Sequence, residues 1–274
     1  NIVRSTGNGE TWDNATSPTE NALYGVTSGN KTFVGVGANG NIVRNTDNGS
    51  SFDNVTSPTE NLLYGVTFGS NTFVAVGDNG TIVRSTDNGS TWDNATSPTS
   101  KRLRATGFGN NTFVAVGYDG NIIRSTDYGS TWDNATSSTA KDLWGVGFGN
   151  NTFVAAGVDG DIVRSTDNGS TWNNVTSPNT DIYMFREISF GNNTFVIAGY
   201  SGNIVRSTDN GSTWDNATSP TTVNLPGVGF GNNTFVVVGA SSGNIVRSTD
   251  NGSSFDNATT PSTGIGFFEV TFLE

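Results

Sequence analysis

The stretch STDNGSTWDNATSP, residues 85–98, decides the fold, because versions of it recur along the whole chain. Each version begins within or directly after a short apolar segment of the form NIVRS. These segments begin at residues 1, 41, 81, 121, 161, 203 and 244, so successive copies lie 40 to 42 residues apart. Repeats of this period are typical of β-propellers with four-stranded blades. We therefore expect one domain over residues 1–274.

One repeat contains four short apolar segments that are separated by turn-forming residues. These segments are LYGVTFG (63–69), TFVAVG (72–77), TIVRST (81–86) and TWDNAT (91–96). Asn, Asp, Ser and Gly between them favour tight turns, and near-continuous apolar runs are typical of strands covered on both faces. The chain also has 36 glycines and lacks long runs of helix formers. Each repeat is therefore predicted to form one antiparallel blade.

The two ends of the chain are predicted to share a blade. Six complete sets of four strands run from about residue 23 to 259, and residues 1–16 add a hairpin of third and fourth strands. The segment GFFEVTFLE at 266–274 adds a lone first strand. Radial folds commonly close by building one blade from both termini. We therefore predict an all-β, seven-bladed propeller whose last blade lacks its second strand, with a six-bladed ring as the alternative.

The recurring segment fits the pattern S-x-D-x-G-x-T-W and resembles the Asp-box, or BNR-repeat, β-propellers. These include sialidases, sortilin-type receptors and photosystem II assembly factors. The aspartates that match the pattern are Asp47, Asp87, Asp127, Asp167, Asp209 and Asp250. The aspartate is expected to accept hydrogen bonds from turn amides, the glycine to adopt a positive φ and the tryptophan to be buried. In the resembling families the motif lies away from the ligand site, so we interpret these aspartates as structural.

A second repeated position carries arginine in every copy. These residues are Arg4, Arg44, Arg84, Arg124, Arg164, Arg206 and Arg247. Folding each hairpin about its turn places Arg84 opposite Asp93, and six of the seven arginines face an aspartate in this way. Cross-strand ion pairs therefore explain the arginines without a ligand, and an anion-binding ring is the alternative.

The repeats differ mainly in the linkers between blades and in the turns between second and third strands, which share the rim opposite the S-x-D hairpins. Candidate ligand-binding residues there are Tyr24, Tyr64, Arg104, Tyr118, Trp144, Arg186, Tyr200 and Phe268. An insertion is expected to add Tyr183, Met184 and Phe185 to this rim. Aromatic and Arg side chains supply large contact area in recognition sites. The alternative is that these loops vary because little constrains them.

Charge and composition narrow the function. A net charge of −11 disfavours nucleic acid and membrane partners. The chain has no His and no Cys, and we expect neither a cofactor nor a metal site. The Arg-Ile-Pro segment that the sialidase resemblance implies does not occur. Glu187 and Asp142 are the candidate carboxylate pair for glycoside hydrolysis.

The sequence thus predicts a non-catalytic, monomeric binding module or scaffold for a carbohydrate or a protein segment. A protein-assembly factor and a glycosidase-like enzyme are the alternatives. The acidic composition, rich in Asn and Thr, favours an extracellular or periplasmic location.

Overall fold

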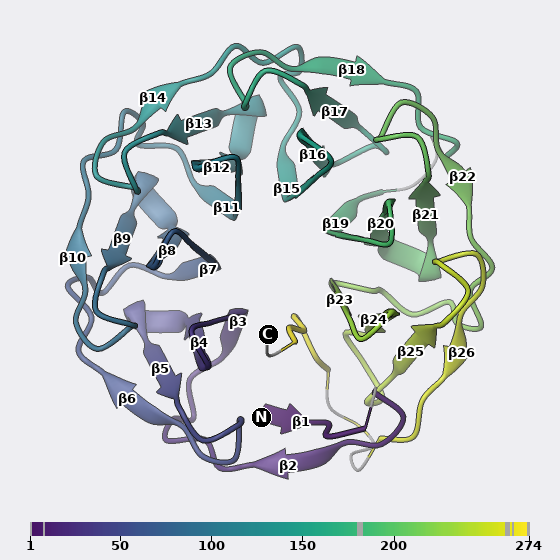
Figure 1. Ribbon diagram of the computed structural model, residues 1–274, viewed down its shortest axis with the longest axis horizontal. Coiled ribbons are helices and arrows are strands. Elements are labelled where there is room, and N and C mark those ends of the chain that lie inside the picture. The colour runs from purple at the N-terminus through teal and green to yellow at the C-terminus, as the bar shows by residue number, and fades with distance from the viewer. Residues whose placement is uncertain (1, 8, 180–182, 261–263, 265, 273–274) are drawn as a thin grey trace.

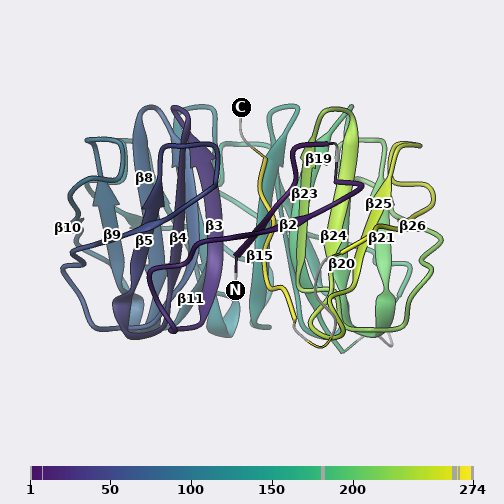
Figure 2. The same cartoon turned by 90° about the horizontal axis from the view of Figure 1, so that it is seen from below.

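The chain forms a β-propeller, a ring of antiparallel sheets around a central channel (Figure 1). The computed structural model describes all residues except 1, 8, 180–182, 261–263, 265 and 273–274. Six four-stranded sheets have their strands in chain order, so each repeat forms one blade from the centre outward. Seen edge-on, the strands run between two rims (Figure 2).

The strands of the six blades have the following bounds. Blade one contains β3 (Leu23–Gly29), β4 (Thr32–Gly37), β5 (Ile42–Asn45) and β6 (Asp53–Val55). Blade two contains β7 (Leu63–Gly69), β8 (Thr72–Gly77), β9 (Ile82–Ser85) and β10 (Asp93–Asn94). Blade three contains β11 (Leu103–Gly109), β12 (Thr112–Gly117), β13 (Ile122–Ser125) and β14 (Asp133–Asn134).

The remaining blades repeat this arrangement. Blade four contains β15 (Leu143–Gly149), β16 (Thr152–Gly157), β17 (Ile162–Ser165) and β18 (Asn173–Val175). Blade five contains β19 (Phe185–Gly191), β20 (Thr194–Gly199), β21 (Ile204–Ser207) and β22 (Asp215–Asn216). Blade six contains β23 (Gly227–Gly231), β24 (Thr234–Val238), β25 (Ile245–Ser248) and β26 (Asp256–Asn257).

Four short 3₁₀ helices join second and third strands. They are η1 (Ala38–Gly40), η2 (Asp78–Gly80), η3 (Tyr118–Gly120) and η4 (Tyr200–Gly202). They lie together on one rim, at the bottom of Figure 2. Among the described residues no helix has the length and apolar character needed to cross a membrane.

The core lies between the blades. Second strands are buried on both faces, as their apolar runs predict, and Phe73 is fully buried. Trp92 packs between blades one and two, against Val34 and Ile42 from one side and Phe73 from the other. Equivalent clusters join the next blades around the ring. Each blade is thus held mainly by apolar contact with its neighbours.

The prediction of seven blades is wrong in its count. The described residues form six four-stranded blades, as in the alternative, and one two-stranded sheet of β1 (Ile2–Arg4) and β2 (Asp13–Ala15). This sheet and residues 266–272 fill the sector between blades six and one (Figure 1). Residues 266–272 form no strand. The missing second strand explains both findings, because it is the element that would join the first strand to the third.

The S-x-D-x-G-x-T-W segment closes each hairpin between third and fourth strands. Asp87 Oδ1 accepts hydrogen bonds from the Thr91 amide at 2.9 Å and from Ser85 Oγ at 2.8 Å. Gly89 has a φ of +79°, and its carbonyl accepts a bond from Trp92 Nε1 at 3.1 Å. Equivalent bonds are made at Asp127, Asp167, Asp209 and Asp250. Each aspartate is thus used within its own turn.

The repeated arginines differ from the prediction. Arg84 does lie opposite Asp93 in the sheet register. However, no salt bridge within the described part of the chain joins one of these arginines to the aspartate opposite it. Arg44 instead reaches the next hairpin, where its Nε donates to the Asn88 carbonyl at 2.7 Å. The same contact joins Arg164 to Asn210 and Arg206 to Asn251. These side chains tie neighbouring blades together.

Candidate functional site

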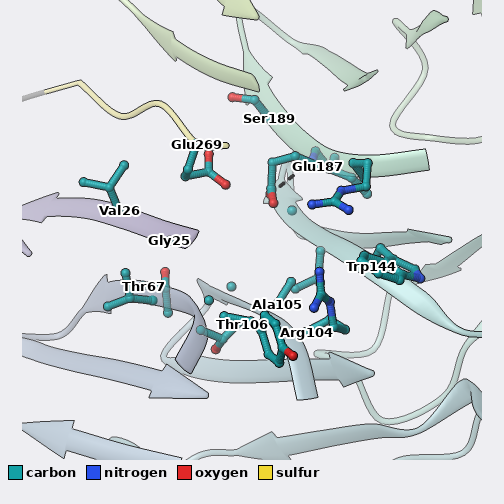
Figure 3. A pocket seen from close by; sticks show the side chains of 18 of the residues that line it. Gly25, Val26, Thr67, Arg104, Ala105, Thr106, Trp144, Glu187, Ser189 and Glu269 are labelled. Atoms are coloured by element: carbon teal, nitrogen blue, oxygen red, sulfur yellow. Dashed lines mark hydrogen bonds between the residues drawn. The ribbon is translucent and has the colours of Figure 1, made fainter. Parts of the chain in front are cut away.

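The first strands of the blades surround a central pocket of about 370 Å³. One aligned position near the start of each first strand, and its counterpart in residues 266–272, lies at the pocket wall. Around the ring these aligned positions are Tyr24, Tyr64, Arg104, Trp144, Arg186, Pro226 and Phe268. All seven line this one pocket, on the rim away from the S-x-D hairpins. Figure 3 shows Arg104 and Trp144 at its wall.

Five of these side chains form a stacked series, which we call the rim arc: Tyr24, Tyr64, Arg104, Trp144 and Arg186. The rings of Tyr24 and Tyr64 lie 5.8 Å apart. The Arg104 guanidinium lies 3.9 Å from the centre of the Tyr64 ring and 3.8 Å from that of Trp144. Arg186 lies 4.7 Å from the Trp144 ring. Cation–π contacts of this kind hold the arginines in place without neutralising them.

Two arginines give the rim arc positive charge, and the charge of Arg186 also acts to lower the pKa of Glu187 and of Glu269 in the same pocket. Among the described residues no salt bridge includes Arg104 or Arg186. Burial lowers the pKa of Arg104, and the charge of Arg186 lowers it further, to about 10. Arg104 Nε is buried and has no hydrogen-bond partner. A third cation nearby, Arg102, forms a salt bridge with Asp78 and donates a hydrogen bond to Tyr118. The arc is therefore electrostatically suited to a carboxylate.

Deeper in the channel lie two glutamates, Glu187 and Glu269. Each carboxyl group affects the pKa of the other, and Figure 3 shows the two side chains on facing walls of the pocket. Each is partly exposed to the channel but surrounded by protein on most sides. Burial raises the pKa of Glu187 to about 7. Burial and the charge of Glu187 raise the pKa of Glu269 well above its ordinary value. Such a pair shares one proton near neutral pH.

The fold places the two glutamates by the same rule. Glu187 is the third residue of β19, and Glu269 is the aligned residue of the segment 266–272; other repeats have Gly25, Gly65 and Gly145 at this position. Glu187 Oε1 accepts the amide of the residue that follows it at 3.1 Å, and Glu269 does the same at 3.0 Å. Small residues elsewhere on this ring leave space for the carboxyl groups. Glu269 was not predicted, although the neighbouring Phe268 was aligned with the other first strands and Glu269 replaces a glycine at the next position.

The other candidate residues have different environments. Tyr118 adjoins the rim arc, with its ring 6.1 Å from that of Trp144. Tyr200 lies outside the pocket and packs against exposed Tyr183. The prediction that the insertion adds Met184 and Phe185 to the rim is wrong, because both side chains are buried. Phe185 begins β19 at a position where other blades have a core leucine.

The proposed catalytic partner Asp142 lies away from the pocket. Its Oδ1 accepts the Asp119 amide at 2.8 Å in a turn on the rim. Glu187 therefore faces Glu269 rather than Asp142. In the part of the chain that the structure describes, no group of three or more His, Cys, Asp or Glu residues is arranged to hold a metal ion.

No family model and no curated protein matches this sequence. Its fold is similar to the structure described as YCF48 bound to D1 peptide, with 18% identity and a TM-score of 0.69, over 88% of this chain and 82% of that one. The GH74 enzyme of Niastella koreensis is 20% identical with a TM-score of 0.68, over 92% of this chain and 40% of that one. The computationally designed protein Ika8 is 13% identical with a TM-score of 0.66, over 97% and 94%. At these identities the likeness establishes the fold, a β-propeller, and leaves the chemistry open.

Proposed function

We propose that this chain is a non-catalytic binding module of the Asp-box type, which holds an acidic protein segment against the rim arc. The observation that carries the proposal is the pair Arg104 and Arg186, stacked on Trp144 without a salt-bridge partner among the described residues. The aromatic rings pre-organise the two guanidinium groups, so little side-chain entropy is lost when an anion binds. A carboxylate from a partner would accept charge-assisted hydrogen bonds from both.

A protein segment is favoured over a carbohydrate because arginine side chains already cover the aromatic faces on which a sugar would stack. Arg104 lies over the rings of both Tyr64 and Trp144, and Arg186 also lies over Trp144. Little of the Trp144 face is then left for a sugar ring. The YCF48 propeller, bound to D1 peptide, gives a precedent for a peptide on a similar fold. A scaffold in protein assembly is the corresponding role.

A binding role is favoured over glycoside hydrolysis by the interaction between the two acids. Retaining glycosidases separate their two carboxyl groups by roughly 5–5.5 Å and inverting enzymes by more, so that substrate fits between them. Glu187 and Glu269 instead affect each other's ionisation, which favours one proton held between the two carboxyl groups over a separate acid and nucleophile.

The proposal is tested with peptide and glycan arrays probed by the labelled protein and by three variants. Arg104→Ala and Arg186→Ala are expected to weaken binding of acidic peptides at least tenfold, with stronger loss at higher salt. Glu60→Gln, at an exposed linker position, is the control and should bind like the unchanged chain. Glycan binding that survives loss of both arginines, or glycoside turnover that disappears in Glu187→Gln, would refute the proposal.

A further inference from the structure

The sector between blades six and one has the frame of a blade without its second strand. Residues 266–272 take the place of the first strand, since the Phe267 amide donates to the Gly239 carbonyl at 2.9 Å. Leu225 makes the same bond to Gly199 one blade earlier, at 3.0 Å. The ring closes where Ser28 Oγ donates to the Phe272 carbonyl. β1 and β2 take the places of third and fourth strands.

Two strand edges face each other across this sector. In the described part of the chain β1 pairs with β2 only, so its inner edge has no ladder partner. Residues 266–272 likewise form no ladder on the side towards β1. A cavity of about 560 Å³ extends through this sector. Where a second strand would lie, the cavity is lined mainly by apolar side chains. These are Val3, Trp12, Leu23, Phe33, Val43, Phe267 and Val270.

Packing around the ring identifies what is missing. Between blades one and two, the second strand of blade two adds Phe73 and Ala75 to the core cluster. The cluster beside blade six combines Val236 and Val238 of that blade with Phe267 and Val270, and among the described residues it has no counterpart of the Phe73 and Ala75 that the next second strand supplies in blade two. On the blade-one side, Leu23 and Phe33 stay partly exposed, although Leu63 and Phe73 at the same positions of blade two are fully buried. On both sides of the gap, apolar side chains therefore lack the packing partners that a second strand supplies in the other blades.

We propose that this gap binds an extended segment of a second polypeptide, which enters as the missing strand. The segment would run antiparallel to both β1 and residues 266–272. In blade two the second strand, β8, is likewise antiparallel to both of its neighbours, β7 and β9. Its side chains would alternate between blade six and blade one, and both walls are apolar. The suitable sequence is therefore the second-strand pattern of this chain, T-F-V-A-V-G at 72–77. The unpaired backbone groups on both sides of the gap can form hydrogen bonds with a polypeptide backbone, which a small apolar ligand cannot do.

A second copy of this chain is a less suitable occupant than a separate partner. Its own second strands are already paired on both edges within their blades. Donating one would open a core cluster of the donor. A partner segment that is unpaired before binding loses no such contacts. This inference concerns a surface separate from the rim arc.

The test uses a labelled synthetic peptide with the sequence of residues 69–80, GSNTFVAVGDNG. We expect saturable binding at one peptide per chain, and at a peptide concentration a hundred times Kd a rise in Tm of roughly 5–10 °C. Hydrogen exchange of residues 2–4 and 266–272 should slow in the complex. The control peptide carries Val74→Asp and Val76→Asp and should bind at least tenfold more weakly, because both aspartates would enter an apolar wall.

Two variants of the protein separate this surface from the rim arc. Val3→Asp should lower the affinity for the peptide at least tenfold, whereas Arg104→Ala should leave that affinity unchanged. Exchange data on the unchanged protein decide the question if Val3→Asp fails to fold. Equal binding of the two peptides, or protection around Tyr64 and Trp144 instead of β1, would overturn the proposal. So would a dimer that forms without peptide and protects residues 2–4 and 266–272.

Discussion

Replacing Glu187 with glutamine is expected to stabilise the protein above pH 7. Burial raises the pKa of Glu187 from 4.5 to about 7, so the folded state holds a proton that the unfolded chain has already lost. Below pH 4.5 the ionisation of Glu187 has little effect on the free energy of unfolding. Between pH 4.5 and 7 the free energy of unfolding falls as pH rises. At about 1.4 kcal/mol for each pKa unit, the cost of ionisation reaches about 3 kcal/mol. Glutamine keeps the hydrogen-bonding capacity of the site and cannot ionise.

The assay is urea and thermal unfolding at pH 5 and pH 8. We expect Glu187→Gln to exceed the unchanged chain by less than about 1 kcal/mol at pH 5 and by up to about 3 kcal/mol at pH 8. For a chain of this size, that difference is a rise in Tm of roughly 5–10 °C. Glu60→Gln is the control, because Glu60 is exposed on a linker. It should leave the free energy of unfolding unchanged at both pH values.

The interaction between the two carboxyl groups supplies a second check. Glu269→Gln should also stabilise the protein at pH 8. The double variant should gain less than the sum of the single variants, because either change alone removes the repulsion between the two acids. If Glu187→Gln and Glu60→Gln have equal stability at pH 8, the pair is fully hydrated and the reasoning from burial is refuted.

Three further predictions concern the frame. Asp87→Ala should lower the free energy of unfolding by about 1–2 kcal/mol. Burial acts to raise the pKa of Asp87, but hydrogen bonds from Thr91, Ser85 and Ser90 outweigh it and lower the pKa to about 2, so in unfolding titrations its contribution should vanish as pH falls from about 4 to 2. Arg44→Ala should cost about 1 kcal/mol in urea unfolding and Arg84→Ala less, because Arg44 Nε donates to a carbonyl whereas Arg84 Nε has no hydrogen-bond partner among the described residues. Leu63→Ala should cost about 2–5 kcal/mol and Leu23→Ala less than half as much, because Leu23 borders the open gap; equal losses would contradict the gap.

The sequence predicts the repeated parts of the fold closely. The first two strands of blade two have the predicted bounds, 63–69 and 72–77, because turn chemistry and apolar runs change sharply there. The aligned position that contains Arg104 and Trp144 was found because the copies could be compared with one another. Repetition thus gives a single sequence the contrast that usually needs relatives.

What escaped prediction depends on contacts between repeats. The arginine register opposite aspartate was right, but Arg44 is long enough to cross to the next blade, where it donates to the turn carbonyl of Asn88. Glu269 is next to the predicted Phe268, but its position opposite Glu187 depends on how the last segment closes the ring. The blade count failed because a missing strand changes which segments can pair. These features are set by the closed ring and not by any one repeat.

The central claim is that partners bind the rim arc and not the rim that carries the S-x-D hairpins. It is tested most directly by placing a photo-reactive benzoylphenylalanine at Tyr64 or at Tyr128, an exposed residue in one of those hairpin turns. Acidic peptides selected on the array are then cross-linked to each protein and the adducts are located by mass spectrometry. We expect adducts at Tyr64 that disappear with Arg104→Ala, and none at Tyr128. Adducts at Tyr128, or adducts at Tyr64 that do not depend on Arg104, would contradict the account.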